Sequence, residues 1–128
     1  MKNSKQYFSP MQFSNPLNVQ CHYEITAPEI YGHVITEMRP LNWSAFVHGS
    51  GTGGTMMGVK KYIDYLELNV KCVLTTPEES AETHGIQGIN DGADFLLDKT
   101  LMDEVIQIKT EDAIARMKRF WRETGILI

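Results

Sequence analysis

The stretch Gly49-Ser50-Gly51-Thr52-Gly53-Gly54-Thr55 decides the fold, and it stands between an apolar run ending at Val47 and an amphipathic run opening at Met56. This order predicts a strand, a glycine-rich turn and a helix. Glycines let a backbone turn tightly and come close to a ligand, and the unpaired N–H groups of the first helical turn then face the occupant of that turn. The loop therefore predicts a phosphate-binding site.

The segments around this loop predict an α/β fold. Residues 43–48 and 70–75 are short apolar runs bounded by turn-forming residues, which is typical of strands buried on both faces. A strand, a helix and a second strand over this length form a right-handed parallel unit. Residues 103–108 predict a third strand, and 110–124 predict a helix, capped by its first residue and ended by Gly125. We therefore expect a three-layer α/β fold, with a mostly parallel sheet and flanking helices.

The flanking segments predict one partial domain over residues 1–128, with an extended N-terminal segment (1–15) and a phosphate-binding part (16–128). A short helix is expected over 17–23, and a long loop over 76–92, because the latter is rich in Pro, Glu, Ser, Thr, Asn and Gly. The last three residues, 126–128, are expected to begin another buried strand.

A second helix is expected to begin at Thr26 and to run to about Met38. Thr26 and Glu29 have the spacing of a capping box, with a proline in the first turn. The apolar residues of this helix recur at helical spacing, so Ile30 and Val34 are expected to be buried. The same pattern predicts that Ala113, Ile114, Met117 and Trp121 are buried in the last helix.

Composition and charge are those of an ordinary globular chain. The 128 residues are 42% hydrophobic and 22% charged, with a net charge of −4. The basic residues are scattered apart from a helical set at 116–122, which we interpret as a solvated helix face, so no nucleic-acid partner is expected. Two distant cysteines and four dispersed histidines predict no metal site. We expect a cytoplasmic protein without a membrane span.

Two kinds of phosphate compound fit the loop. Residues 49–54 satisfy the GxGxxG pattern of dinucleotide-binding folds, but the second predicted strand ends without the acidic residue that would hold a ribose. The hydroxyls of Thr52 and Thr55 instead add two donors to a cup of N–H groups, which suits a single terminal phosphate monoester. Both hypotheses stay open on the loop alone.

Five stretches of the chain make the second hypothesis specific: Gln12–Asn18, Pro28–Ile30, Gly49–Thr55, Ile86–Ile89 and Asp103–Ile106. In this order and at this spacing they resemble the second half of cysteine synthase (O-acetylserine sulfhydrylase), a pyridoxal-phosphate enzyme of the tryptophan-synthase-β fold type, also called PLP fold type II. The resemblance covers nearly the whole chain. It implies that the chain forms part of the large domain of that fold.

The resemblance also implies site residues and a reaction. Gln12 would lie beside the substrate carboxylate, and Gly88 would border the cofactor on a loop that moves when substrate binds. The reaction of the family is β-replacement, in which O-acetylserine and sulfide give cysteine and acetate. Asn90 departs from the glycine usual at its position in the family. The cofactor phosphate would be held by Gly51, Thr52, Gly53, Gly54 and Thr55.

Other parts of the family's active site have no counterpart in this sequence. The Schiff-base lysine of the family follows an Asn-Pro in the first half of the enzyme, and none of the eight lysines here has that context. We therefore name no catalytic residue and expect only phosphate contacts to pyridoxal phosphate. The isolated chain is expected to lack cysteine synthase activity.

The resemblance suggests protein partners as well. Strands of the family's large domain come from its first half, so we expect self-association, or binding to a complementing or complete cysteine synthase chain. An alternative function is a non-catalytic protein that docks on such an enzyme or on its partner serine acetyltransferase. The family's active site accepts the C-terminal isoleucine of that acetyltransferase, and this chain ends in Ile128.

Overall fold

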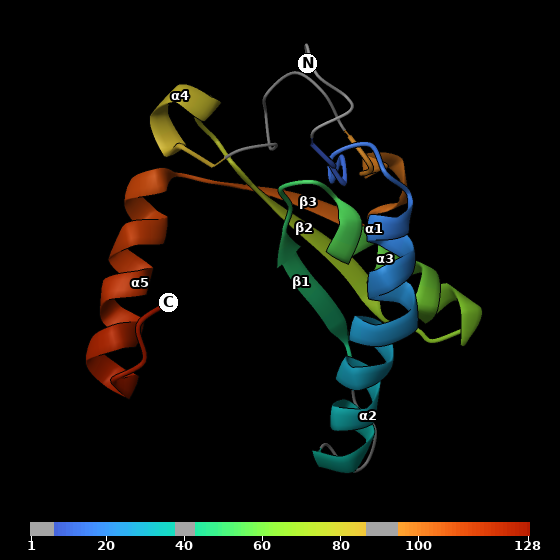
Figure 1. Cartoon of the computed structure of the whole chain (residues 1–128). Helices are drawn as coiled ribbons and strands as arrows, with labels where there is room; N and C mark the ends of the chain where they lie inside the picture. The colour runs from blue at the N-terminus through green and yellow to red at the C-terminus, as the bar shows by residue number, and fades with distance from the viewer. Residues whose placement is uncertain (1–6, 38–42, 87–94) are drawn as a thin grey trace.

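The computed structural model describes residues 7–37, 43–86 and 95–128, and shows three parallel strands with flanking helices (Figure 1). The sheet order is β1-β2-β3, so the predicted α/β fold is confirmed. The elements are α1 (Leu17–Cys21), the π-helical turn η1 (His22–Thr26), α2 (Ala27–Glu37), β1 (Ala45–Gly49), α3 (Gly54–Tyr65), β2 (Lys71–Pro77), α4 (Ala81–His84), the 3₁₀ turn η2 (Lys99–Leu101), β3 (Glu104–Ile108) and α5 (Thr110–Thr124).

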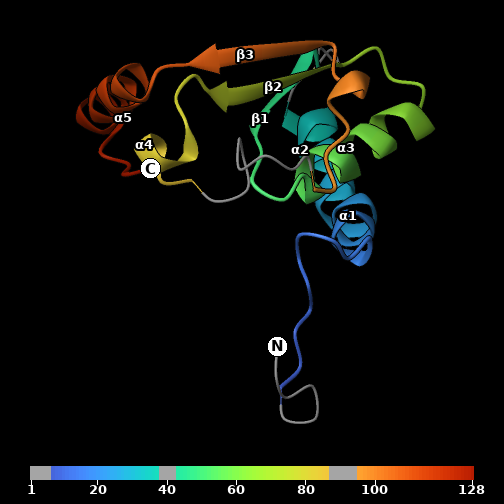
Figure 2. The same ribbon diagram turned by 90° about the horizontal axis from the view of Figure 1, so that it is seen from above.

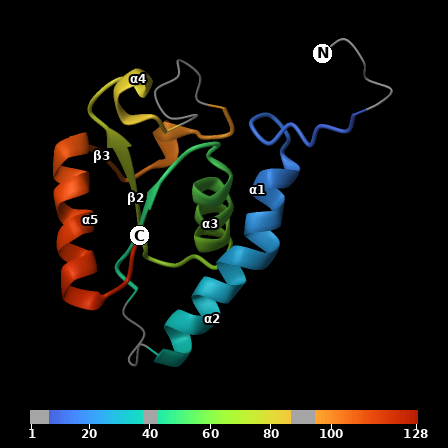
Figure 3. The same cartoon turned by 60° about the vertical axis from the view of Figure 1, so that its left-hand side comes forward.

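The helices lie on both sides of the sheet. Helices α1, α2 and α3 cover one face, and α5 runs along the other side, as Figures 1 and 3 show together. Seen from above in Figure 2, β2 and β3 end close to α4 and α5, while residues 7–16 extend away from the sheet. The carboxyl ends of β2 and β3 therefore lie at the end of the sheet that carries α4 and the start of α5.

The core forms between α3 and the middle strand. Met56, Val59 and Ile63 repeat at helical spacing on α3 and are at most 2% exposed, and they pack in one cluster with Cys72 and Leu74 of β2. Burying a side chain of this size stabilises a fold by about 1.5–3 kcal/mol relative to leaving it exposed. The spacing of Met56, Val59, Ile63 and Leu66 predicts this helix face; the first three are confirmed as buried, whereas Leu66 is half-buried.

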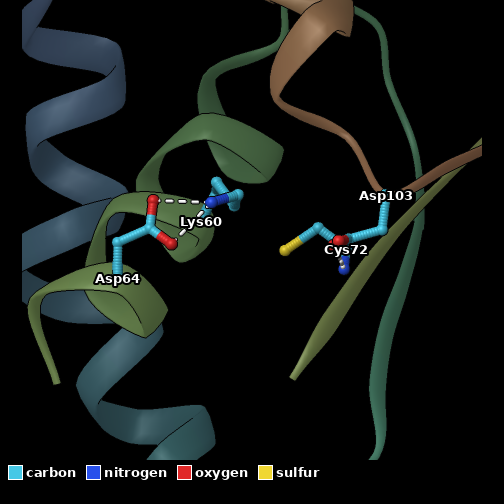
Figure 4. Close-up of polar contacts among 4 residues, drawn as sticks. All are labelled: Lys60, Asp64, Cys72 and Asp103. Carbon is cyan, nitrogen blue, oxygen red and sulfur yellow. Dashed lines mark hydrogen bonds and ion pairs between the residues drawn. The ribbon is translucent and has the colours of Figure 1, made fainter. Parts of the chain in front are cut away.

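The strands β2 and β3 begin with a reciprocal pair of hydrogen bonds (Figure 4). The N–H of Cys72 donates to Oδ2 of Asp103 over 2.7 Å, and the N–H of Asp103 donates to the Cys72 carbonyl over 3.0 Å. The Cys72 thiol points toward α3, where Lys60 and Asp64 form an ion pair at 2.5 Å. Burial raises the pKa of Cys72 to about 11. This thiol is therefore a packing group.

The first two predicted helices form one continuous helical run. Thr26 was predicted as the N-cap of a separate helix, and that prediction is wrong, because the π-helical turn η1 joins α1 directly to α2. The Ala27 N–H donates to the His22 carbonyl, five residues earlier. A proline in a regular helix clashes with the preceding turn, and the widened π turn accommodates Pro28 without ending the helix. Ile30 and Val34 are half-buried, and Met38 lies outside the described residues.

Burial on the sheet's flanks is lower than the apolar pattern predicts. Strand β1 is an edge strand, and Val47 is 60% exposed, so it is not buried on both faces. In α5, Ile114 is 43% and Trp121 is 51% exposed, while Met117 is half-buried and Ala113 is exposed. The residues after α5, 126–128, are irregular and exposed, because a strand forms only beside a pairing neighbour.

The predicted long loop is interrupted by structure at its start. Strand β2 continues to Pro77, and α4 follows at Ala81–His84, while residues 87–92 of the loop lie outside the described residues. Helix α5 begins beside this segment, since both carboxylate oxygens of Glu79 accept the Thr110 N–H at 3.1 Å. The Thr110 hydroxyl also donates to Glu79, at 2.9 Å. The prediction that Thr110 caps this helix is wrong: the N-cap is Lys109, Thr110 is the first helical residue, and its N–H is bound by Glu79 instead.

Candidate functional site

The glycine-rich loop joins the carboxyl end of β1 to the N-terminus of α3, as predicted. Gly53 adopts the left-handed conformation with φ of 90°, and a Cβ there would lie 2.5 Å from the Leu97 nitrogen. The first regular helical bond runs from the Met57 N–H to the Gly53 carbonyl at 3.0 Å. By helix geometry, the N–H groups of Thr55 and Met56 precede that bond and point toward the loop. These amides and the positive end of the helix dipole favour an anion.

Two hydrogen-bond donors fix the Thr52 hydroxyl beside the N-terminus of α3. The Gly54 N–H lies 3.2 Å from the Thr52 hydroxyl oxygen, and Nδ2 of Asn18, on α1, lies 3.1 Å from it. The same Nδ2 group donates to the carbonyl of Gln12 over 2.8 Å. One side chain of α1 thus connects the phosphate loop to the segment that carries Gln12.

The Thr55 hydroxyl is held by His22, which lies one turn after Asn18 in the helical run α1–η1. Nε2 of His22 lies 3.2 Å from the Thr55 hydroxyl, and Nδ1 of His22 lies 2.9 Å from the Thr26 hydroxyl. The three side chains form one hydrogen-bonded chain across η1 and α3. This chain fixes the position of the second loop hydroxyl.

Two glycines of α3 make room for these supports. A Cβ at Gly54 would overlap the Asn18 side-chain amide, and a Cβ at Gly58 would lie 2.5 Å from Cβ of His22 and 2.8 Å from the Val19 carbonyl oxygen. Gly54 and Gly58 are four residues apart, as are Asn18 and His22, so each pair lies on one helix face. The close approach of the two helices therefore depends on these glycines.

A cavity of about 530 Å³ opens at the carboxyl ends of the strands, beside the loop. It is bordered by Gly49–Gly51 of the loop, by Thr75–Pro77 at the end of β2, and by Ala113 and Ile114 on the first turns of α5. Ligands of open α/β sheets bind outside the carboxyl ends of the strands. The cavity and the helix N-terminus are thus neighbouring parts of one site.

Two polar atoms near this cavity have no hydrogen-bond partner within the described parts of the chain. They are Oγ of Ser50, a residue only 3% exposed, and Nε2 of His84, and both residues line the cavity. Nδ1 of His84 accepts the Ile86 N–H over 2.9 Å, so in the neutral ring Nε2 carries the proton. Buried polar groups normally have partners, so these two atoms have unused hydrogen-bonding capacity beside the cavity.

A third histidine lies on β1, just before the loop. His48 stacks on Phe46 with ring centroids 5.6 Å apart, and its Nδ1 has no partner among the residues that the structure describes. Burial, with a further contribution from the positive charge of His22, lowers the pKa of His48. His48 therefore favours its neutral form beside the loop.

The structure brings most of the predicted site residues together. The loop residues 51–55 form the turn and the first helical turn, and Gln12 is exposed but tied through its carbonyl to the same point by Asn18. Gly88 and Asn90 lie outside the described residues, so their predicted roles stay predictions. The contacts of residues 51–55 with a phosphate also stay a prediction.

Sequence reasoning missed Asn18 and His22. Both fall in the helix predicted over 17–23, and their spacing of four residues places them on one face. The matching spacing of Gly54 and Gly58 was the other available signal. Neither pattern shows that the two faces meet.

The described residues lack two kinds of feature. They contain no group of three or more His, Cys, Asp or Glu side chains arranged to hold a metal ion. No helix among residues 7–37, 43–86 and 95–128 is both long and apolar enough to cross a bilayer.

Comparison with known proteins gives a consistent result. The family model for "Pyridoxal-phosphate dependent enzyme" matches residues 1–128. Cysteine synthase A of Escherichia coli (strain K12) is 36% identical over 143 residues, which cover 98% of this chain and 42% of that protein. Cysteine synthase of Staphylococcus aureus (strain Mu50) is 32% identical over 137 residues, covering 99% of this chain and 42% of its own length.

Solved structures agree in fold. A hydrogen sulfide-producing enzyme from Fusobacterium nucleatum superimposes with a TM-score of 0.80 at 30% identity, over 98% of this chain and 44% of its own. Cysteine synthase from Entamoeba histolytica gives 0.77 at 33% identity, over 97% and 37%. The chain thus spans well under half the length of these relatives. The family match over all 128 residues shows that the chain belongs to the pyridoxal-phosphate dependent enzymes.

Proposed function

We propose that this chain forms the phosphate-holding part of a cysteine synthase-like enzyme. Such an enzyme converts O-acetylserine and sulfide into cysteine and acetate. One observation carries the proposal. The hydroxyls of Thr52 and Thr55 are both fixed by side chains of the preceding helical run, at a helix N-terminus beside a cavity at the strand ends. Such a cup fits a terminal phosphate, whose oxygens accept hydrogen bonds from amides and hydroxyls.

The relatives support a serine derivative as substrate. Similar structures include an O-acetylserine dependent cystathionine beta-synthase from Helicobacter pylori, with a TM-score of 0.76 at 28% identity, and an O-ureido-L-serine synthase at the same values. Both names refer to a serine that carries a substituent on oxygen. We propose that this chain serves the same class of substrate, with Gln12 beside the substrate carboxylate and Gly88 bordering the cofactor.

The residues of this chain have binding and orienting tasks. Pyridoxal phosphate, when bound, supplies the electron sink for chemistry at the amino-acid carbons. Thr52, Thr55 and the amides of the first turn of α3 would hold its phosphate, and Ser50, whose hydroxyl has no partner among the described residues, lines the adjoining cavity. Residues 51–55 therefore orient the cofactor rather than react.

We further propose that the 128 residues by themselves do not make cysteine. The lining of the cavity includes no lysine from the described parts of the chain. A Schiff-base lysine must reach the cofactor's carbonyl carbon, so one would have to come from elsewhere. The test is cysteine formation from O-acetylserine and sulfide by the purified chain, and turnover above the uncatalysed rate would refute this point.

Phosphate recognition is tested with aldehyde-free ligands, because an aldehyde would react with surface lysines. Equilibrium dialysis compares the affinity of the chain for pyridoxamine phosphate with its affinity for pyridoxamine. We expect a preference of at least about 100-fold for the phosphate ester, since two charge-assisted hydrogen bonds contribute about 3 kcal/mol or more and each 1.4 kcal/mol is tenfold. Equal affinities would refute the proposal.

The variant Thr52→Val keeps the side-chain shape and removes the hydroxyl. We expect it to reduce the preference by about tenfold, the effect of one hydrogen bond to a charged group. Thr36→Val is the matched control, because the Thr36 hydroxyl bonds only carbonyls of its own helix, Gly32 and His33, among the contacts described. The control is expected to keep the wild-type preference.

Two other hypotheses stay predictions. If the loop binds a dinucleotide, titration with NAD should release or absorb heat in a calorimeter. If the chain is a regulatory protein, it should form a complex with a complete cysteine synthase. For the latter, a peptide ending in the last four residues of this chain would compete with substrate if Ile128 entered that enzyme's active site. An absence of competition would rule out that role.

A further inference from the structure

We propose that Asn18 is a positioning residue, which obliges the Thr52 hydroxyl to donate its proton to the bound phosphate. The inference deepens the function proposed above and rests on it, because it requires a phosphate at the loop. Asn18 itself does not touch the phosphate. It acts through Thr52.

The orientation of the Asn18 amide follows from its two contacts. Nδ2 of Asn18 lies 2.8 Å from the carbonyl oxygen of Gln12 and 3.1 Å from Oγ1 of Thr52. A carbonyl oxygen carries no proton, so the group that faces Gln12 must be the NH₂ end of the amide. Its second N–H is then directed at Thr52, and Thr52 is the acceptor in that bond.

The hydrogen-bond inventory of Thr52 then determines what its hydroxyl can do. A hydroxyl has two acceptor positions and one donor proton. The acceptor positions are filled by Asn18 Nδ2 at 3.1 Å and by the Gly54 N–H at 3.2 Å. The hydroxyl proton is the remaining group, and it suits an oxygen that only accepts. A phosphate dianion offers such oxygens.

Packing keeps Asn18 in this orientation. Its side-chain amide lies against the backbone of Gly54, where a Cβ would overlap it. The bond to Gln12 holds the other proton of the amide, so that the phosphate loop and the predicted substrate segment share one anchor. Rotation of the amide would therefore break two hydrogen bonds at once.

A double-mutant cycle tests this role by a ratio of affinities. The affinities for pyridoxamine phosphate and pyridoxamine are measured for wild type, Asn18→Ala, Thr52→Val and the double variant, with far-UV circular dichroism to check each fold. We expect Asn18→Ala to lower the phosphate preference about five- to tenfold when Thr52 is present, as for one hydrogen bond, and by less than about twofold in Thr52→Val. Coupling through Thr52 predicts this difference.

A purely structural role for Asn18 predicts other outcomes. Asn18→Ala would then weaken the binding of both ligands equally, or lower the phosphate preference as much in Thr52→Val as in wild type. Either result overturns the inference. If Asn18→Ala does not fold, Asn18→Asp decides instead, because its carboxylate has the same shape but attracts the Thr52 proton. We expect at least a tenfold lower preference for this variant when Thr52 is present and a smaller loss in Thr52→Val, where only repulsion between the carboxylate and the phosphate remains; equal losses in the two backgrounds would overturn the inference.

The wild-type measurement separates this inference from the function on which it rests. If wild type binds both ligands equally, the proposed phosphate site is refuted and the inference with it. If wild type prefers the phosphate ester but the cycle shows no coupling, the phosphate site stands and only the role of Asn18 is refuted.

Discussion

Replacing Gly58 by alanine tests the close helix packing that supports the loop. A Cβ at Gly58 would lie 2.5 Å from Cβ of His22 and 2.8 Å from both the Tyr23 nitrogen and the Val19 carbonyl oxygen. Two of these atoms are backbone, so the helical run α1–η1 must move as a unit. Overpacking of this kind costs up to about 3 kcal/mol, and the helix propensity of alanine offsets about 1 kcal/mol of it. We expect Gly58→Ala to lower the free energy of unfolding by about 2 kcal/mol.

Gly32→Ala is the matched control, because a Cβ at Gly32 in α2 would meet no atom within 4 Å. Because alanine has a higher helix propensity than glycine, this variant should have a free energy of unfolding about 0.5–1 kcal/mol above that of wild type. Thermal unfolding followed by circular dichroism should separate the two variants by roughly 10 °C in this size range. If Gly58→Ala is as stable as wild type, or if both variants lose stability equally, the packing argument is wrong.

Three further outcomes are expected. The hydrogen bonds from Thr110 lower the pKa of Glu79, so its contribution to stability is present above the ordinary value of 4.5 and is lost as the pH falls below it. The variant Glu79→Gln should therefore lose less free energy of unfolding than wild type as the pH falls below this value. An unchanged pH dependence of the free energy of unfolding would contradict this. At pH 8, iodoacetamide should label exposed Cys21 but spare buried Cys72 until urea unfolds the chain, as mass spectrometry would show. Exposed apolar side chains on β3 and α5 should cause self-association or complex formation, and a single monomer at all concentrations in sedimentation velocity would argue against it.

The elements that the sequence predicts best depend on neighbouring residues. The glycine loop, the helix α3 behind it and the parallel strands β2 and β3 follow from turn-forming residues and from the spacing of apolar side chains. Thr26 shows the limit of this reasoning. Its capping-box pattern is a valid local signal, but the helix before it continues through a π turn, so its hydroxyl bonds His22 instead.

Burial depends on what covers an apolar face. The periodicity of α5 identifies which residues share a face, yet Ile114 and Trp121 remain about half exposed because too few described residues pack on them. Val47 is exposed for a similar reason, since burial alternates along β1 and Val47 lies on the face of that strand that the described residues leave uncovered. Periodicity reports orientation, whereas exposure is a property of the surrounding layers.

The sequence by itself determined the class of ligand site, because a strand, a glycine-rich turn and a helix N-terminus are made by consecutive residues. Only the tertiary structure decided how that site is supported. Asn18 and His22 reach Thr52 and Thr55 across 34 and 33 positions of the chain, and they do so because Gly54 and Gly58 let two helices approach. Hydrogen bonds between distant residues depend on packing in three dimensions, which no local pattern contains.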